Sequence, residues 1–169
     1  MLIFDLETDG LLHDLTRIHC LVFYDTDEDR TYIFNDEGDE EPIVRGITLL
    51  EDSDCIVGHN IIGYDNCAIK KCYPFYEPKG KVIDTLLLSR LYHPDLMKKD
   101  QMDKPKFMPL QLYGRHSLEA WGYRVKEYKG CFSKETDWKE WSPEMQDYCE
   151  QDVNVTVKLC KHFHRYLIG

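Results

Sequence analysis

The chain has 169 residues, of which 43% are hydrophobic and 12% aromatic, values typical of an ordinary globular domain rather than of a disordered chain. No apolar run approaches the roughly 20 residues of a membrane span, and no basic segment precedes an apolar stretch as in a secretory signal. We therefore expect one domain over residues 1–169, a cytoplasmic location and no membrane partner. Its seven cysteines are odd in number and scattered, which does not predict a disulfide framework.

The formal net charge of −10 argues against broad electrostatic binding of nucleic acid. It does not exclude a nucleic-acid enzyme, because clustered carboxylates that hold divalent cations present positive charge to a phosphate once the metal has bound. The acidic composition therefore indicates metal binding and does not exclude DNA as a substrate.

The first half of the chain predicts strands and one helix. Segments rich in β-branched and aromatic residues, separated by turns with Asp and Gly, predict an antiparallel meander over residues 1–7, 17–25 and 30–35. Residues 41–52 have helical spacing of apolar positions, with Pro42 suited to the first turn, and residues 54–60 form a short apolar strand. A helix followed by such a strand indicates a crossover back into the same sheet.

The second half predicts mainly helices. We expect helices over 64–73, 82–93, 116–124 and 142–167, with a long mobile loop over 94–111. The last helix is the longest, and Ser142 is its expected N-cap. Three strands, a helix, a strand and later helices are compatible with a ribonuclease-H-like α/β fold, in which helices flank a mixed sheet.

Three groups of polar residues are candidates for chemistry. Asp5 and Glu7 lie two apart on a strand, so both side chains point to one face, where like charges repel unless cations or donors compensate. Taken without the other groups, this pair could either bind metal or belong to a turn or helix-cap cluster. Asp65 opens a helix after a strand, which by itself favours a helix-start role. Tyr148 and Asp152 lie four apart and share one face of the last helix.

The combination and order of these groups resemble the signature of the DEDD family of 3′-to-5′ exonucleases (DnaQ-like), in its tyrosine-bearing branch. The segments "DTLLLSRLYHPDL", "GRHSLEAWGYRVKEYKG" and "YCEQDVNVT" also look like the proofreading domain of family A DNA polymerases from short-tailed, T-seven-type bacteriophages. The resemblance covers nearly the whole chain, which ends without polymerase segments. A free-standing exonuclease and a domain excised from a polymerase both remain open.

The resemblance implies hydrolysis of terminal phosphodiesters at DNA 3′ ends, single-stranded for preference, with release of nucleoside 5′-monophosphates. It implies two divalent ions, Mg²⁺ with Mn²⁺ as a substitute, which oxygen ligands suit. Asp5 would contact both ions, Glu7 and Asp152 would complete the first site, and Asp65 would hold the second largely through water. Tyr148 would orient the attacking water, because a phenol with an ordinary pKa near 10 is a poor general base at neutral pH.

Substrate contacts are implied in the same way. Thr8 would meet the terminal nucleotide, Leu11 would wedge between the last two bases, and Asn60 and Tyr64 would line the cleft. The Lys-rich segment Lys98–Lys106 either supplies phosphate contacts or is a solvated loop. Three residues of the family-like segments are expected to support the core rather than to react: Asp84, His116 and Trp121.

Two alternatives remain. An RNA-directed exonuclease of the same superfamily would use the same carboxylates, and DNA is preferred by resemblance only. A non-catalytic docking module would bind a separate DNA polymerase or replication protein, which is also a partner expected for the exonuclease. On either reading, the expected location is the host cytoplasm if the protein is phage-encoded. Such a module has no physical need for clustered, mutually repelling carboxylates.

Overall fold

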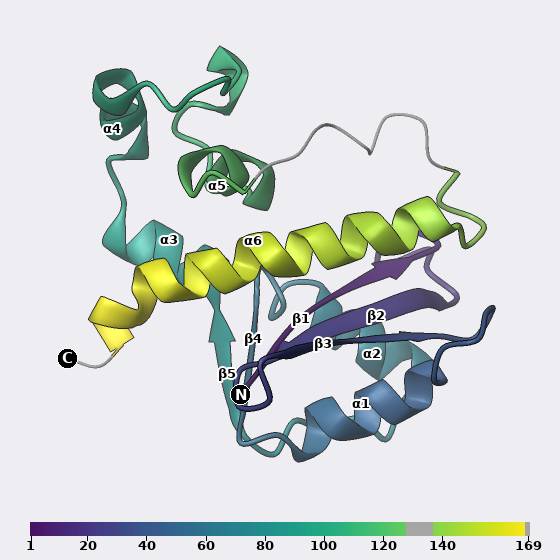
Figure 1. The fold of residues 1–169 in the computed structure, drawn as a ribbon. Coiled ribbons are helices and arrows are strands. Elements are labelled where there is room, and N and C mark those ends of the chain that lie inside the picture. Colours follow the sequence, from purple (N-terminus) through teal and green to yellow (C-terminus); the bar gives the residue numbers. More distant parts are fainter. Residues whose placement is uncertain (128–136, 168–169) are drawn as a thin grey trace.

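The computed structural model describes residues 1–127 and 137–167 (Figure 1). A five-stranded mixed sheet has the order β3-β2-β1-β4-β5. Its strands are β1 (Leu2–Thr8), β2 (Ile18–Asp25), β3 (Arg30–Asn35), β4 (Cys55–Gly58) and β5 (Lys81–Asp84). Strands β1, β2 and β3 pair antiparallel, while β4 pairs parallel with β1 and β5 parallel with β4. The predicted meander, the crossover and the α/β class with a mixed sheet are confirmed.

Helices cover both faces of the sheet. They are α1 (Ile43–Asp52), α2 (Asp65–Cys72), α3 (Thr85–Tyr92), α4 (Leu96–Asp103), α5 (Leu118–Arg124) and α6 (Pro143–Leu167), with a 3₁₀ turn at Leu110–Leu112. Figure 1 shows α1 and α2 on one face and the long α6 across the other, with α3, α4 and α5 gathered on the side of α6. No helix in the described part of the chain is long and apolar enough to cross a membrane.

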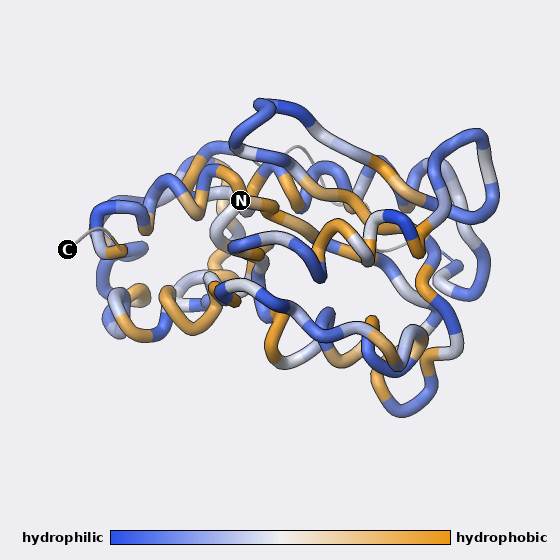
Figure 2. Tube along the Cα trace, turned by 90° about the horizontal axis from the view of Figure 1, so that it is seen from below, coloured by the Kyte–Doolittle hydropathy of each residue, from blue (hydrophilic) through white to orange (hydrophobic). Residues whose placement is uncertain are grey.

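The central strand β1 divides its side chains between these two faces. Leu2, Phe4 and Leu6 are buried in the main apolar core, which also contains residues of α1 and α2. Because side chains alternate along a strand, Asp5 and Glu7 project to the opposite face, toward α6. Figure 2 shows hydrophobic residues concentrated along the central strands and hydrophilic ones in the outer loops.

Two predictions for the second half of the chain are wrong. Residues 82–84 belong to strand β5, and the helix expected from 82 begins only at Thr85. The expected mobile loop over 94–111 contains α4 and the 3₁₀ turn. Strand β5 is specified by its parallel pairing with β4, and α4 by the burial of Leu96 and Asp100 one turn apart. Both are tertiary effects that local periodicity does not report.

The other local predictions hold. Ser142 Oγ accepts a hydrogen bond from the Met145 backbone N–H at 3.1 Å, as an N-cap should. The cysteines of the described residues are free thiols, while Cys131 lies outside the described residues.

Candidate active site

Asp5 and Glu7 place two carboxylates on the α6 face of the sheet. Both lie in β1, where Asp5 is paired with Val22 and Glu7 with Cys20 of β2. Their side chains are half-buried. The predicted shared face is therefore confirmed.

Asp65 is the first residue of α2 and is only 4% exposed. A second buried carboxylate, Asp84, holds the turn that leads to it, because it accepts hydrogen bonds from the backbone N–H groups of Asn60 (2.9 Å) and Ile62 (3.1 Å). Asp84 also caps α3 by accepting a hydrogen bond from the Leu86 N–H at 2.9 Å. The turn before α2 is thus fixed by β5, which delivers Asp65 to the carboxylate cluster.

Asp152 and Tyr148 lie on one face of α6, and their side chains are hydrogen-bonded to each other. The Tyr148 ring also packs edge-on against Trp138, with 6.3 Å between ring centroids. Glu119 of α5 lies near enough to Asp152 to raise its pKa. Glu119 was not predicted, because nothing in the sequence links two residues of different helices.

These carboxylates lie close enough together to raise one another's pKa values. Burial raises the pKa of Asp5 well above its usual range, and the charges of Asp65, Asp152 and Glu7 raise it further. Burial is also the main cause that raises the pKa of Glu7, followed by the charge of Asp152. The pKa values of Asp65 and Asp152 rise to about 7, chiefly through burial. Four carboxylates therefore share one poorly solvated region.

No ion pair joins any of these four carboxylates to a Lys, Arg or His within residues 1–127 and 137–167. Buried carboxylates without a cation need protons or bound metal to be stable. Their oxygens are the ligands that hard divalent cations prefer. The donor set therefore fits Mg²⁺ or Mn²⁺.

Cys149 is a neighbour of this cluster that sequence reasoning missed. Its Sγ lies 3.7 Å from Asp5 Oδ2, and one ligand atom each from Asp5, Glu7 and Cys149 lie within 4.8 Å of one another. The side chain is fully buried against Cys20 and Val22. In the sequence it is a small residue on the apolar face of a helix, which is a packing signal rather than a ligand signal.

The predicted substrate residues gather around the loop that follows β1. The Thr8 and Tyr64 hydroxyls lie 2.8 and 2.6 Å from the Gly10 carbonyl oxygen, and they also contact each other. Leu11 follows directly and is 65% exposed. Asn60 is exposed on the turn held by the Asp84 carboxylate, with a left-handed φ of 64°. The first three positions are thus connected through Gly10, whereas Asn60 adjoins them only through the turn before α2.

Residues expected to support the core surround α3. Ser89 of α3 bonds His116 Nδ1 (2.7 Å) and accepts a hydrogen bond from Trp121 Nε1 (2.8 Å). Together with the Asp84 cap, these bonds attach α3 to α5 and to the turn before α2. The geometry agrees with positioning roles for Asp84, His116 and Trp121.

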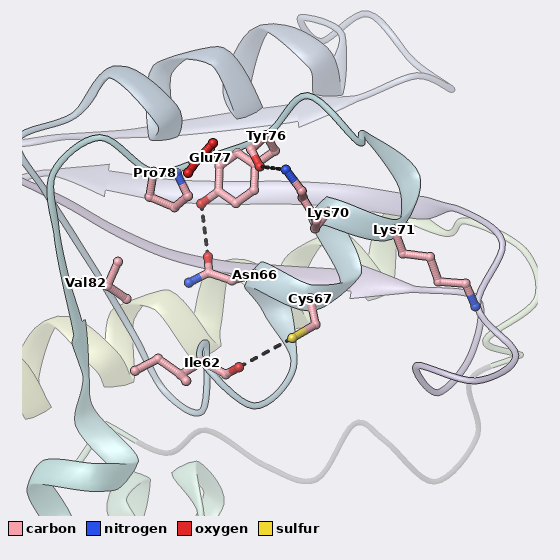
Figure 3. A pocket seen from close by; sticks show the side chains of 9 residues that line it. All are labelled: Ile62, Asn66, Cys67, Lys70, Lys71, Tyr76, Glu77, Pro78 and Val82. Carbon is pink, nitrogen blue, oxygen red and sulfur yellow. Dashed lines mark hydrogen bonds between the residues drawn. The ribbon is translucent and has the colours of Figure 1, made fainter.

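A pocket of about 800 Å³ lies elsewhere, between α2 and β5 (Figure 3). Lys70 Nζ donates to the Tyr76 carbonyl oxygen (2.9 Å) and the Tyr76 hydroxyl donates to Asn66 Oδ1 (3.0 Å), so these polar groups already have partners. None of the four clustered carboxylates lines this pocket. This pocket is therefore separate from the carboxylate cluster.

Comparison with known proteins agrees with this geometry. The chain is 34% identical to the DNA-directed DNA polymerases of Escherichia phage T7 and of Enterobacteria phage T3, over 94% of its own length but 26% of theirs. It thus spans about a quarter of these relatives, and the predicted resemblance to phage polymerases is confirmed.

Solved structures of Brucella melitensis NrnC have the same fold. One is bound to pGG (TM-score 0.60, 17% identity) and one has bound Mg²⁺ (TM-score 0.59, 15% identity); each alignment covers 97% of this chain and 73% of NrnC. The family model of the RNase H superfamily matches residues 2–164. The chain therefore belongs to the RNase H superfamily and has its exonuclease-type fold.

Proposed function

We propose that the chain is a metal-dependent 3′-to-5′ exodeoxyribonuclease that removes nucleoside 5′-monophosphates from DNA 3′ ends, single-stranded ends for preference. Four carboxylates from β1, α2 and α6 carry this proposal, because they share one region and none of them forms an ion pair with a basic side chain in the described part of the chain. The phage polymerase relatives support it, since they match this chain along nearly its whole length.

Within this proposal, Glu7, Asp152 and Asp5 would hold one divalent cation, and Asp65 would hold a second together with Asp5. Bound divalent cations polarise a phosphoryl oxygen and lower the pKa of water. The fold contributes the placement of the carboxylates, because β1 fixes two of them on a central strand and α6 lies directly over that face. Mg²⁺ is the expected ion and Mn²⁺ its substitute.

Tyr148 positions the attacking water rather than removing its proton. Its side chain is anchored by the hydrogen bond to Asp152 and by the Trp138 ring, so its hydroxyl has a defined place beside the carboxylates. A phenol needs no deprotonation to orient water by hydrogen bonding. We assign it a positioning role in hydrolysis.

Thr8, Tyr64, Asn60 and Leu11 receive the terminal nucleotides. The exposed Leu11 side chain follows the loop that Thr8 and Tyr64 brace, which suits an apolar wedge between two bases. Wedging and stacking accept any base. Paired ends must first be unstacked, at a cost of a few kcal/mol, so frayed or single-stranded ends are preferred.

The test is digestion of a 5′-labelled single-stranded DNA with Mg²⁺, beside matched RNA and blunt duplex. We expect a ladder that shortens from the 3′ end, most rapidly on single-stranded DNA, and no ladder with Asp5→Ala. This variant should remain folded, because removing one carboxylate from a repelling cluster costs little stability. Asp147→Ala is the matched control, since Asp147 is an exposed carboxylate of α6 and should leave digestion unchanged.

Digestion by Asp5→Ala at the wild-type rate would remove the cluster from the chemistry. Digestion of RNA in preference to DNA would assign the same site to an RNA-directed exonuclease. If neither Mg²⁺ nor Mn²⁺ supports digestion and calorimetry detects no Mn²⁺ binding, the chain would act as a docking module for a polymerase or replication protein.

A further inference from the structure

Helix α4 and the segment after it display large apolar side chains to solvent. We call residues 97–110 the α4 surface. Its exposed members are Met97 (50%), Met102 (72%), Phe107 (83%) and Leu110 (80%). Four exposed apolar side chains within fourteen residues make this segment a candidate interaction site.

This surface is held rigidly by a buried clamp. Asp100 is 2% exposed and accepts hydrogen bonds from Arg124 Nε (2.9 Å) and Nη2 (2.7 Å). Its carboxylate also accepts the Gly114 N–H at 2.8 Å, while Arg124 Nη1 donates to the Arg115 carbonyl oxygen at 2.8 Å. Arg124 of α5 therefore holds Asp100 near the start of the α4 surface and Arg115 just beyond its end, and the residues between them are displayed.

The backbone at the tip is held in an uncommon conformation. Lys104 ends α4 as a left-handed C-cap (φ 46°), and Phe107 also has a left-handed φ of 64°, which few non-glycine residues adopt. Despite this, the Phe107 ring is turned to solvent rather than used for packing. Such outliers concentrate at functional positions, where the surrounding structure imposes them.

The α4 surface is also locally basic in an acidic chain. Residues 97–110 contain four Lys but two Asp, in a chain of net charge −10, and Asp100 is already neutralised by Arg124. Lys106 Nζ lies over the Phe107 ring, 4.9 Å from its centroid. Cations beside an exposed aromatic ring form the arrangement that binds single-stranded nucleic acid, through phosphates and base stacking.

We propose that the α4 surface binds the single DNA strand that leads away from the 3′ end held at the carboxylates. This inference rests on the proposed exonuclease function and assigns the strand its path. Figure 1 shows α4 on the same side of the sheet as α6, the side to which Asp5 and Glu7 project. The charge balance favours a polyanion over an apolar protein partner, because lysines are depleted at protein–protein interfaces, whereas they contact the phosphates of nucleic acid.

The experiment measures binding apart from cleavage. Fluorescence anisotropy with Ca²⁺ in place of Mg²⁺ gives the affinities of labelled single strands of roughly 4 and roughly 20 nucleotides, lengths that bracket known single-strand sites. We expect Phe107→Ala to weaken the long strand about five- to tenfold and to leave the short strand unchanged. Phe107→Trp should restore the affinity, because it restores the stacking surface.

A second variant and two controls separate the contributions. Lys106→Gln should weaken the long strand and reduce the slope of log K against log salt by about 0.7, as expected for one lost phosphate contact on single-stranded DNA. Phe75→Ala and Arg45→Gln are matched controls, since both residues are exposed but belong to the side of the sheet with α1 and α2. Neither control should change either affinity.

Unchanged affinity of Phe107→Ala and Lys106→Gln for the long strand would overturn the inference and leave the surface to a protein partner. Equal weakening of both lengths would overturn it as well, because it would place Phe107 at the 3′ end. If the wild type cleaves DNA but these variants bind normally, only this inference fails. If the wild type cleaves nothing, the proposed function fails, and the dependence of binding on strand length still decides this inference.

Discussion

Replacing Asp65 with asparagine should stabilise the metal-free protein. The carboxylate is 4% exposed and belongs to a cluster of four. Burial and the charges of Asp84 and Asp152 raise its pKa from 3.8 to about 7, although two backbone hydrogen bonds oppose the shift. A carboxylic acid whose pKa is raised in the folded state destabilises the fold when it ionises, and an amide of similar shape does not ionise.

The magnitude follows from the pKa shift. Each unit corresponds to 1.36 kcal/mol, so ionised Asp65 costs the fold at most about 4 kcal/mol at about pH 8. The cluster shares its charges and water relaxes around them, so we expect a gain of about 1–2 kcal/mol in the free energy of unfolding, or about 2–8 °C in Tm. The effect depends on pH. Protonated Asp65 stabilises the fold fully below the pKa of the unfolded chain, near 3.8, and this stabilisation is lost as the pH rises through about 7. The gain of Asp65→Asn should therefore disappear near pH 4.

Thermal and urea unfolding in EDTA at about pH 4 and about pH 8 measure this difference. Asp84→Asn is the matched control, because Asp84 is equally buried but accepts backbone N–H groups with both oxygens. Its amide nitrogen would face an N–H donor, so this variant should lose about 1–3 kcal/mol at both pH values. With Mg²⁺ present, the wild type should be more stable than Asp65→Asn. The wild type gains stability from the bound ion, and the variant has lost a ligand.

A loss of stability in Asp65→Asn that is equal at both pH values would refute the reasoning. It would mean that the backbone hydrogen bonds to the Asp65 carboxylate outweigh burial and the repulsion of Asp84 and Asp152. Stabilisation by Mg²⁺ equal to that of the wild type would separately remove Asp65 from the metal site.

Two further predictions concern α6 and α5. Tyr148→Phe should slow single-turnover cleavage about 100-fold, because an orienting hydrogen bond is lost while the carboxylates remain. Rapid-quench kinetics measure this rate, and an unchanged rate would exclude the tyrosine from the mechanism. Asp100→Ala should lower the free energy of unfolding by about 3–5 kcal/mol, because it leaves the Arg124 guanidinium, only 9% exposed, without its partner. Urea unfolding measures this loss, and a loss below about 1 kcal/mol would contradict the clamp that holds the α4 surface.

The sequence predicts the parts of the site that depend on local periodicity. Asp5 and Glu7 had to share a face because side chains alternate along β1, and Tyr148 and Asp152 had to share one because they lie one helical turn apart. Asp65 was placed by the boundary between an apolar strand and a polar helix start. These relations hold within a single element, so they survive any arrangement of the elements around it.

The remaining features depend on contacts between elements. The approach of Glu119 to Asp152 and of Cys149 to Asp5 follows from how α5 and α6 pack, which no local pattern specifies. The same is true of α4, whose sequence is polar and lysine-rich but whose buried Asp100 is neutralised from α5 by Arg124. A carboxylate that looks solvated in the sequence can thus be a buried structural group.

The fold treats its buried carboxylates in two ways, and the difference supports a metal site. Asp100 receives a guanidinium and a backbone N–H, and Asp84 receives three backbone N–H groups. Both show that this fold can compensate a buried carboxylate where it serves structure. The carboxylates of β1, α2 and α6 have raised pKa values even though Asp65 accepts backbone hydrogen bonds, and none of them has an ion pair with a basic side chain in the described chain. Lys158 of α6 and Arg124 of α5 pair with other acids. Carboxylates that repel one another and have no basic partner among residues 1–127 and 137–167, in a fold that compensates Asp84 and Asp100, have the chemistry of a divalent-cation site.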